Sequence, residues 1–533
     1  MNLQRNIFMA ILALLICFPG YAHSIPAFPG AEGFGKDSVG GRGGIVVHVT
    51  NLNDYGPGSL REAVEAPPRH YANNVAEWES STEYEARVSA GNTRPRHYPN
   101  GTWKNELEPA YLTRMDSIGH RIVVFDVSGI INLEDDLNIT YPFMTIAGET
   151  SPGGILVTGR QTTIKAHDII MRHMRFRVGS HRIADGADPE LLDSLDIYGK
   201  YWSGVDTAYN IIIDHSSISW GVDETFTISG GVRNTTVQWS IISEGLANAG
   251  HPKGQHSKGL MVSGKYVYDN TVSLHHNYIA HNNDRNPLVE GPPGVDITVD
   301  VVNNVIYNFN VMPMGLETPK INWTHNYAKQ GPSSSASFSA EVTHYDLAHA
   351  ITPAPLLYVA GNIGSTRLSQ SEPHWNVGWY YWNQPTSTDW KRDTAWSVPP
   401  ITTQEMSASV ANCILTGAGA TAPVRDSVDT RVIADFSAGS GQIIDDITYP
   451  DDFPTFATPA VQTDTDNDGM PDSWELSHKL DKNTDDSAGD ADSDGYTNIE
   501  EYLHYLSAKS YAYNSECMPA SHPPGTPINL RLY

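Results

Sequence analysis

Short runs of alternating apolar and polar residues recur along the middle of the chain. Most neighbouring runs start about 22 to 27 residues apart, and the runs begin at Met144, Asp168, Asn210, Asn234, Thr271, Thr298 and Lys320. Their alternation and β-branched residues predict strands, and a repeat of this length predicts a solenoid rather than separate domains. With strands in the same sense and three short faces per coil, the expected fold is an all-β, right-handed parallel β-helix. A β-propeller fits less well, because each blade needs about 40 residues.

The repeat is interrupted at several places. Residues 200–206 and 251–265 fall in wider gaps and have the composition of loops. Residues 67–117 are rich in His, Arg, Tyr and Trp and are expected to form an insertion beside a cleft. After about residue 366 the repeats fade. A helix is expected at 403–417, inside a region that would cap the open end of the solenoid.

Four asparagines occupy similar places in successive runs, namely Asn277, Asn304, Asn326 and Asn362. Amide side chains in such positions can stack at a turn and bond along the ladder, but asparagine is also an ordinary turn residue. Both interpretations are structural.

The first 24 residues have the features of a secretory signal peptide. A basic Arg5 precedes an apolar run over 7–18, and small residues follow near a plausible cleavage point. No later segment approaches the roughly 20 apolar residues of a membrane span. We therefore expect a soluble, secreted protein, extracellular or periplasmic. Cys17 leaves a lipid anchor open, but Ile16 before it is not the small residue that such anchors favour.

Two cysteines, Cys413 and Cys517, remain after removal of the signal. In an oxidising compartment they could form a disulfide. It would close a loop of about 100 residues and contribute up to ~4.7 kcal/mol in the chain-entropy model. Two buried free thiols are the alternative.

The chain is strongly acidic, with a formal net charge of -27. Nucleic acid is therefore a poor ligand, because binding to phosphates requires a basic surface. Much of the charge lies in residues 464–501, which hold 13 acidic residues against two lysines. An anionic substrate would need local cations or a bound divalent metal to overcome this field.

Two segments of the acidic stretch repeat one ligand spacing. Residues 464–475 and 490–501 carry oxygen-bearing side chains at loop positions one, three, five, nine and twelve, with glycine at position six. This spacing supplies the oxygens that calcium prefers, and the glycine makes the sharp turn. The segments resemble the paired loops of thrombospondin type 3 and dockerin-like modules, which implies a structural role for Ca²⁺; a disordered acidic tail is the alternative. The candidate ligands are Asp464, Asp466, Asp468, Asp472 and Glu475, then Asp490, Asp492, Asp494, Asn498 and Glu501.

The stretch over 210–291 pairs strand-like runs with polar residues at their ends. Stacked coils would present Asp223, Lys258 and Arg285 on one surface. Two cations beside an acidic cluster suit an anionic substrate held through a metal ion.

Several separated motifs resemble polysaccharide lyase family 1, the pectate lyases. They are AFPGAEGFG, GSLREAVEA, RIVVFDVSGII, NIIIDHSSISWGVDE and the HHN…DRNP run, in order over about 25–330, with a looser match at TAPVRDSVDTRVI. The resemblance implies a monomer that cleaves 1,4-linked polygalacturonate, an acidic polysaccharide, to unsaturated oligogalacturonides by calcium-dependent β-elimination. In that reaction a base removes the proton beside the substrate carboxylate, and the glycosidic oxygen leaves.

The resemblance also implies roles for particular residues. Arg285 matches the base, a role that favours alkaline pH because free arginine is almost never deprotonated; pairing with a substrate carboxylate is the alternative. Lys258 matches a substrate-binding lysine, or is a surface lysine at a coil turn. Asp193 and Asp223, with Glu224 as a weaker neighbour, match carboxylates of a calcium site. A turn cap for Asp193 and an ion pair for Asp223 are the alternatives.

Two positions depart from the family. Glu290 stands five residues after the candidate base, where many pectate lyases carry a second arginine, and Thr227 aligns with a further metal-binding carboxylate. These departures bear on the calcium geometry and on the preferred uronate. His215, His275 and His276 are expected to be structural or to line a subsite, because they lack a clear ligand set for a metal.

Two other functions compete with the lyase. A β-helix hydrolase would need paired carboxylates flanking the scissile bond. Asp223 and Glu224 offer such a pair, but adjacent residues of a strand point to opposite faces. A non-catalytic carbohydrate-binding protein would retain binding without Arg285.

The expected organisation has five parts. They are the signal peptide at 1–24, the β-helix lyase domain at 25–394, the cap region at 395–460, the calcium-binding tail at 461–505 and an extension at 506–533.

Overall fold

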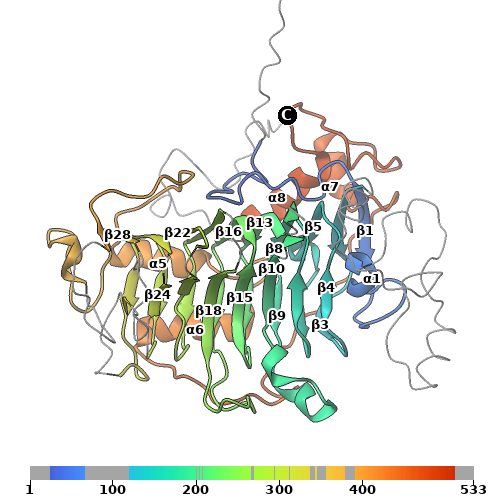
Figure 1. Cartoon of the computed structure of the whole chain (residues 1–533). Coiled ribbons are helices and arrows are strands. Elements are labelled where there is room, and N and C mark those ends of the chain that lie inside the picture. The colour runs from blue at the N-terminus through green and yellow to red at the C-terminus, as the bar shows by residue number, and fades with distance from the viewer. Residues whose placement is uncertain are drawn as a thin grey trace, which may run out of the picture.

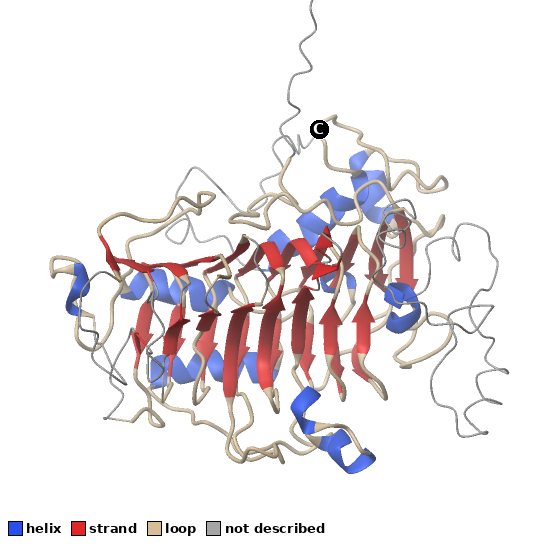
Figure 2. Ribbon diagram, in the orientation of Figure 1, coloured by secondary structure: helices blue, strands red, loops and turns tan. Residues whose placement is uncertain are grey.

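In the computed structural model the chain winds into stacked coils, and three parallel sheets run along the body (Figures 1 and 2). The structure describes residues 25–65, 119–199, 201–202, 205–206, 208–265, 269–292, 294–310, 313–317, 319–335, 343–344, 356–377 and 390–510. The predicted signal peptide, the insertion at 67–117 and Cys517 lie outside these residues.

Each sheet receives one strand from each successive coil, in chain order. Sheet 1 contains β1 (Ile45–Val49), β2 (Arg121–Phe125), β5 (Met144–Ala147), β8 (Ile169–Arg172), β13 (Ala208–Asp214), β16 (Val232–Gln238), β19 (Asn270–His275), β22 (Ile297–Val302), β25 (Lys320–Thr324), β28 (Leu356–Ala360) and β29 (Lys391–Arg392). Sheet 2 contains β3 (Gly129–Asn132), β6 (Ile155–Thr158), β9 (Arg175–Arg177), β14 (Ser217–Ser219), β17 (Ile241–Ser243), β20 (Tyr278–Ala280), β23 (Val305–Tyr307) and β26 (Tyr327–Lys329). Sheet 3 contains β4 (Leu137–Ile139), β7 (Thr162–Ile164), β10 (Leu195–Gly199), β15 (Glu224–Gly230), β18 (Lys258–Gly264), β21 (Leu288–Gly291), β24 (Pro313–Glu317) and β27 (Thr343–His344).

The remaining elements are short or lie outside the coils. A two-stranded antiparallel hairpin joins β11 (Tyr201–Trp202) to β12 (Val205–Asp206). The α-helices are α1 (Leu60–Glu65), α5 (Ala408–Gly417), α6 (Ser427–Ala438), α7 (Asp472–His478) and α8 (Asn498–Ser510), and the 3-10 helices are η1 (Gly148–Thr150), η2 (His181–Asp185), η3 (Pro189–Leu191) and η5 (His374–Asn376). Among the described helices, none has the length and apolar character that crossing a membrane requires.

The predicted parallel β-helix is confirmed, and its core explains the sequence period. One inward-facing column runs through sheet 1, and its members pair in register from coil to coil: Met171, Ile213, Val237, Leu274 and Val301. All of them are fully buried. Because alternate residues of a strand face the same side, each run supplies one apolar layer to this shared core. Both segments expected as loops contain strands: 200–206 holds the β11–β12 hairpin, and 251–265 contains β18 of sheet 3.

The asparagines form a ladder inside the coils. The side-chain oxygen of Asn304 accepts hydrogen bonds from the backbone and the side-chain amide of Asn277, both at 3.0 Å. The side-chain oxygen of Asn326 accepts the same two hydrogen bonds from Asn304, and that of Asn362 accepts them from Asn326. The stacking interpretation is therefore confirmed. The ladder satisfies backbone N–H groups that the turns would otherwise leave buried and unpaired.

The region predicted as an end cap covers one side of the body instead. Helices α5 and α6 run along sheet 2 (Figure 1), where Ile414 and Val432 pack against Tyr278 and Val305. Several outward side chains of sheet 2, among them Ile241, Tyr278 and Val305, are apolar, and these helices bury them. Helix α5 also begins later than the predicted 403, because the Ser407 hydroxyl accepts the Val410 N–H and caps it.

The positions of three helices at the start of the body were not anticipated. Helix α1 closes the first coil, where Leu60 and Val64 join the internal core. Helices α7 and α8 of the acidic tail lie over the end of the body that carries β1 (Figure 1). Helix α8 continues past 505, where the sequence placed the end of the tail.

Candidate active site

The predicted catalytic residues meet where three neighbouring strands of sheet 3 begin. Glu224 opens β15, Lys258 opens β18, and the two residues are paired in register. Lys258 is bridged in turn to Asp284, on the coil that leads into β21. Asp223 directly precedes Glu224, and Arg285 directly follows Asp284. Parallel coils thus bring five charged residues together at one edge of the sheet.

Both cations of the site are compensated by carboxylates from neighbouring coils. Lys258 Nζ lies 2.7 Å from Asp284 Oδ2. The Arg285 guanidinium pairs with the Glu224 carboxylate, and its Nη1 also lies 3.2 Å from the sulfur of Met261. The Arg285 and Lys258 side chains remain 23 % and 17 % exposed, so a ligand can reach both.

Arg285 is held in an unusual state for an arginine. Its backbone has a φ of 60°, in the left-handed region, and its N–H donates to Asp284 Oδ1 at 2.8 Å. Burial lowers the pKa of Arg285, against the opposing charges of Asp223, Glu290 and Asp193. Because removal from water disfavours the charged form, the guanidinium loses a proton more easily here than in solution.

Three carboxylates converge beside the arginine. Oxygens of Asp193, Asp223 and Glu224 lie within 4.8 Å of one another. Burial, the largest effect, and the charge of Asp223 raise the pKa of Asp193 to about 8. Asp193 Oδ1 also accepts the backbone N–H of Glu224 at 3.0 Å. A buried group of hard oxygens with this much mutual repulsion fits a divalent cation such as Ca²⁺.

The argument that Asp223 and Glu224 point to opposite faces is wrong. Strand β15 starts at Glu224, so Asp223 lies in the preceding turn and does not follow the strand alternation. Its carboxylate therefore turns towards Asp193 together with that of Glu224.

Two histidines that sequence reasoning missed hold Asp223. His251 Nε2 and His256 Nε2 lie 3.2 and 2.9 Å from the same oxygen, Asp223 Oδ1. Their rings stack with centroids 3.8 Å apart. Burial would raise the pKa of Asp223, but the hydrogen bond from His256 and the charges of both histidines lower it overall. The sequence signal that could have identified these histidines was their position just before Lys258 in the chain.

The two departures from the family lie within this site. Thr227 of β15 is paired in register with Asp196 of β10, a carboxylate that the sequence analysis did not single out. Burial and the charge of Asp193 raise the pKa of Asp196 well above its usual range. Glu290 of β21 accepts a hydrogen bond from the Ser263 hydroxyl at 3.3 Å.

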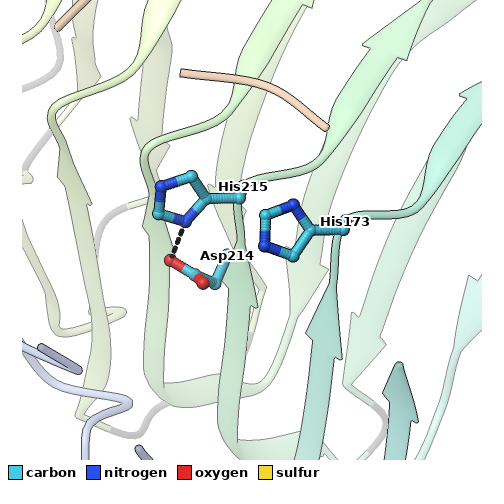
Figure 3. Close-up of side chains that lie close together, drawn as sticks. All are labelled: His173, Asp214 and His215. Atoms are coloured by element: carbon cyan, nitrogen blue, oxygen red, sulfur yellow. Dashed lines mark ion pairs between the residues drawn. The ribbon is translucent and has the colours of Figure 1, made fainter. Parts of the chain in front are cut away.

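His215 lies elsewhere, at the turn from sheet 1 to sheet 2. His173, Asp214 and His215 come within 4.8 Å of one another (Figure 3). The Asp214 carboxylate already accepts from Gln238 at 2.8 Å and from Arg172 at 3.3 Å, and pairs with His215 at 2.9 Å. These contacts supply the positive partners that a metal would supply, so we assign the group a structural role.

His275 and His276 belong to the same turn region. Both are buried, and their Nδ1 atoms lie 3.0 Å apart. His276 stacks on Trp239 with a centroid distance of 4.6 Å, and Trp239 stacks on His215 at 6.0 Å. Burial lowers the pKa of His275 to about 3. The column therefore packs aromatic rings between coils, consistent with the structural role expected for these residues.

The two acidic loops of the tail share one local structure. In each loop the carboxylate at position one accepts the N–H of the glycine at position six, and the carboxylate at position five accepts the N–H at position seven. These bonds measure 2.9 and 3.0 Å in the first loop (Asp464 to Gly469, Asp468 to Met470) and 3.0 and 2.9 Å in the second (Asp490 to Gly495, Asp494 to Tyr496).

The predicted ligands at position nine accept hydrogen bonds within their own loops. Asp472 accepts the backbone N–H of Thr465 at 2.8 Å, and Asn498 accepts that of Ala491 at 3.1 Å, so both close their loops through hydrogen bonds. At position twelve, burial raises the pKa of Glu501 to about 7. Oxygens of Asp464, Asp466 and Asp468 lie within 4.8 Å of one another, as a calcium loop requires.

Comparison with known proteins identifies the family. No protein-family model matches the chain. The chain is 32 % identical to a probable pectate lyase C of Aspergillus flavus over 92 % of its own length and 96 % of that protein, and 31 % identical to the corresponding protein of Aspergillus oryzae with the same coverage. Among solved structures, it resembles the major allergen from cedar pollen with a TM-score of 0.45 and 15 % identity, over 73 % of this chain and 92 % of the other. With relatives above 30 % identity across nearly its whole length, this chain belongs to the pectate lyase family and is a polysaccharide lyase.

Proposed function

We propose that the protein is a secreted pectate lyase that cleaves 1,4-linked polygalacturonate by calcium-dependent β-elimination and releases unsaturated oligogalacturonides. The observation that carries this proposal is the placement of Lys258 and Arg285 directly beside the carboxylate group of Asp193, Asp223 and Glu224. A polyuronate presents one carboxylate per sugar. Such a substrate fits a site that offers two reachable cations and a place for a divalent ion.

The chemistry follows from the charges at the site. The proton beside the uronate carboxylate is weakly acidic, and Ca²⁺ bound by Asp193, Asp223 and Glu224 would neutralise the carboxylate and stabilise the negative charge that develops. Lys258, on the neighbouring coil, would exchange its Asp284 partner for the substrate carboxylate and orient it. Arg285, which is partly exposed beside the same carboxylates, is the group proposed to act on the adjacent carbon.

Arg285 acts as the base in this proposal. Its neutral form accepts the proton from the carbon beside the carboxylate, a carbon–carbon double bond forms, and the bond to the glycosidic oxygen breaks with its electrons on that oxygen. The lowered pKa of Arg285, caused by burial, increases the fraction of neutral base at alkaline pH. The ion pair with Glu224 has to open before the proton moves.

Secretion and calcium binding by the tail complete the proposal. The sequence of residues 1–24 supports export, and an exported enzyme meets millimolar calcium outside the cell. The two loops at 464–475 and 490–501 would hold structural Ca²⁺. We propose that they stabilise the fold and take no part in the reaction.

A direct assay tests the reaction class. Mature protein is incubated with polygalacturonate at mildly alkaline pH, with calcium or with a chelator, while the ultraviolet absorbance of the new double bond is followed. We expect a calcium-dependent rise, and a fall in rate of about 10²- to 10⁴-fold in Arg285→Ala, the range for loss of a general base. Arg233→Ala, an exposed arginine of sheet 1, is the matched control.

The other hypotheses predict different products. New reducing ends without absorbance would support a hydrolase acting through the carboxylates of Asp223 and Glu224. Retained binding without any product, unchanged in Arg285→Ala, would support a carbohydrate-binding protein. Absence of both binding and product on this polymer would contradict polygalacturonate as the substrate.

A further inference from the structure

A carboxylate outside the loop motif joins the first acidic loop. Asp486 lies in the segment between the two loops, and one of its oxygens is within 4.8 Å of oxygens from Asp468 and Glu475. The side-chain amide of Asn498, in the second loop, donates to the Asp486 carbonyl at 2.8 Å and so holds this segment in place. The second loop thus positions a residue of the first site.

Glu475 shows that this cluster is directed at a cation. Its side chain is fully buried, and neither carboxylate oxygen accepts a hydrogen bond from the described part of the chain. One oxygen of Asp468, which is 1 % exposed, is also without a partner among the described residues. A buried carboxylate keeps its charge only with a positive partner, and among the described residues no lysine or arginine forms an ion pair with Glu475 or Asp468; Lys482 pairs with Asp472 instead.

We propose that the first loop and Asp486 together form a Ca²⁺ site that fastens the tail onto the first coils of the β-helix. Its protein ligands would be Asp464, Asp466, Asp468, Glu475 and Asp486, while Asp472 closes the loop. The inference rests on the calcium binding proposed above for the tail and is independent of the elimination reaction.

Ligands and docking residues alternate along the first loop. Met470 lies two positions after the ligand Asp468, with Gly469 between them. Trp474 directly precedes the ligand Glu475. Both side chains are buried against Ile122 and Val124 on the outer face of sheet 1. The chain cannot direct Asp468 and Glu475 at an ion without directing Met470 and Trp474 at the body, so ion binding and docking are coupled.

The glycine of the same loop makes the closest approach to the body. Gly469 has a φ of 90°, and a Cβ added there would come within 2.9 Å of a Val46 side-chain carbon in β1. The carbonyl of Asn467 lies 3.2 Å from Nε2 of His48, also in β1. Strand β1 is the edge strand at this end of sheet 1, so the loop packs on the outer face of the edge strand.

The second loop repeats the arrangement with polar contacts. Its positions seven and eleven, Tyr496 and Glu500, both contact Arg42, which precedes β1. Arg42 lies 5.1 Å from the Tyr496 ring centroid, and its Nε is 2.9 Å from Glu500 Oε1. Positions seven and eleven therefore face the body in both loops, and the tail is fastened at two points.

Hydrogen exchange with calcium titration tests the coupling. Amide exchange in β1 is measured on the full mature protein in Ca²⁺ and in chelator, and calcium binding is measured by calorimetry. We expect β1 to exchange at least about tenfold more slowly in calcium, because docking of the loop suppresses local opening of the edge strand. Glu475→Gln should lose one bound ion and most of this protection, whereas Asp481→Asn, an exposed carboxylate of the same tail, should retain both.

A variant on the body separates docking from ion binding. Arg42→Gln leaves every ligand in place, so it should bind the same number of ions while β1 loses part of its calcium-dependent protection. Exchange in β15 reports separately on the site near Arg285. Calcium bound by the tail with no change in β1 exchange would overturn the proposal, as would full protection of β1 in Glu475→Gln. Neither outcome depends on lyase activity, so failure of the proposed reaction would be recognised independently.

Discussion

Arg285 illustrates how a single residue is prepared for an unusual role. Its left-handed backbone turns the side chain towards Glu224 and Met261 on the preceding coils, where burial lowers the pKa of the guanidinium. Three carboxylates oppose this effect, and Glu290 is the one that lies outside the candidate calcium group. The residue that departs from the family pattern therefore adjusts the basicity of the candidate base.

Substitution of Glu290 should shift the pH profile. In Glu290→Gln one charge that holds the pKa of Arg285 up is lost, so that pKa falls further and the neutral base is present at lower pH. We expect the alkaline rise in kcat to move to lower pH, with a higher rate at a fixed pH below the rise. The measurement is kcat against pH on polygalacturonate.

Glu405→Gln, an exposed carboxylate beyond the coils, controls for the change in net charge. A profile that stays in place in Glu290→Gln, or moves to higher pH, would contradict the assignment of Arg285 as the base. A change confined to KM would instead indicate that Glu290 contacts the substrate.

At the scale of elements, the asparagine ladder and the covering helices supply partners for buried polar groups of the coils. Helix α6 is fastened to β9 by buried ion pairs, in which Arg177 contacts Asp426 at 2.8 Å and Asp429 at 2.7 Å. The asparagine ladder satisfies turn amides between sheets 1 and 2. Both features supply buried partners to groups that the strands leave unpaired.

Removal of one ladder residue should be costly. Asn304→Ala removes the oxygen that accepts the backbone N–H of Asn277. It also removes the amide that donates to the carbonyl of Leu274. Each group left unsatisfied costs about 1–3 kcal/mol, so we expect the free energy of unfolding to fall by roughly 2–6 kcal/mol. Chemical denaturation measures the change.

Asn412→Ala, on the exposed face of α5, is the matched control and should change stability by no more than about 0.5 kcal/mol. Equal effects in the two variants would show that the ladder contributes no more than an ordinary surface asparagine.

At the scale of the molecule, segments distant in sequence enclose the β-helix. The helices of 395–460 cover sheet 2, and the acidic tail covers the outer face of sheet 1 at its first strands. Sheet 3 carries the charged site. Cys413, buried in α5, takes part in a disulfide. Its predicted partner, Cys517, lies outside the described residues.

The predicted Cys413–Cys517 bridge should connect the cover of sheet 2 to the end of the chain. Non-reducing peptide mapping should recover the two cysteines in one linked peptide. Cys413→Ser should lower stability by about 2–4 kcal/mol, because the loop of about 100 residues is no longer closed in the unfolded chain. Thermal unfolding of the variant, beside wild type with and without reductant, measures this. A linked peptide that contains Cys413 without Cys517 would contradict the pairing.

The sequence by itself determined the repeat, the strands and the identity of most charged site residues. These follow from local order, because alternation sets which side chains enter the core and the spacing of the runs sets the coil. Tertiary structure decided which distant residues meet. Four features depend on coil register and on which apolar face remains uncovered. Asp193 lies beside Asp223, His251 and His256 contact Asp223, α5 lies along the side of the body, and Trp474 packs on sheet 1. Such contacts are set by packing between coils, and the order of residues within any one run does not encode them.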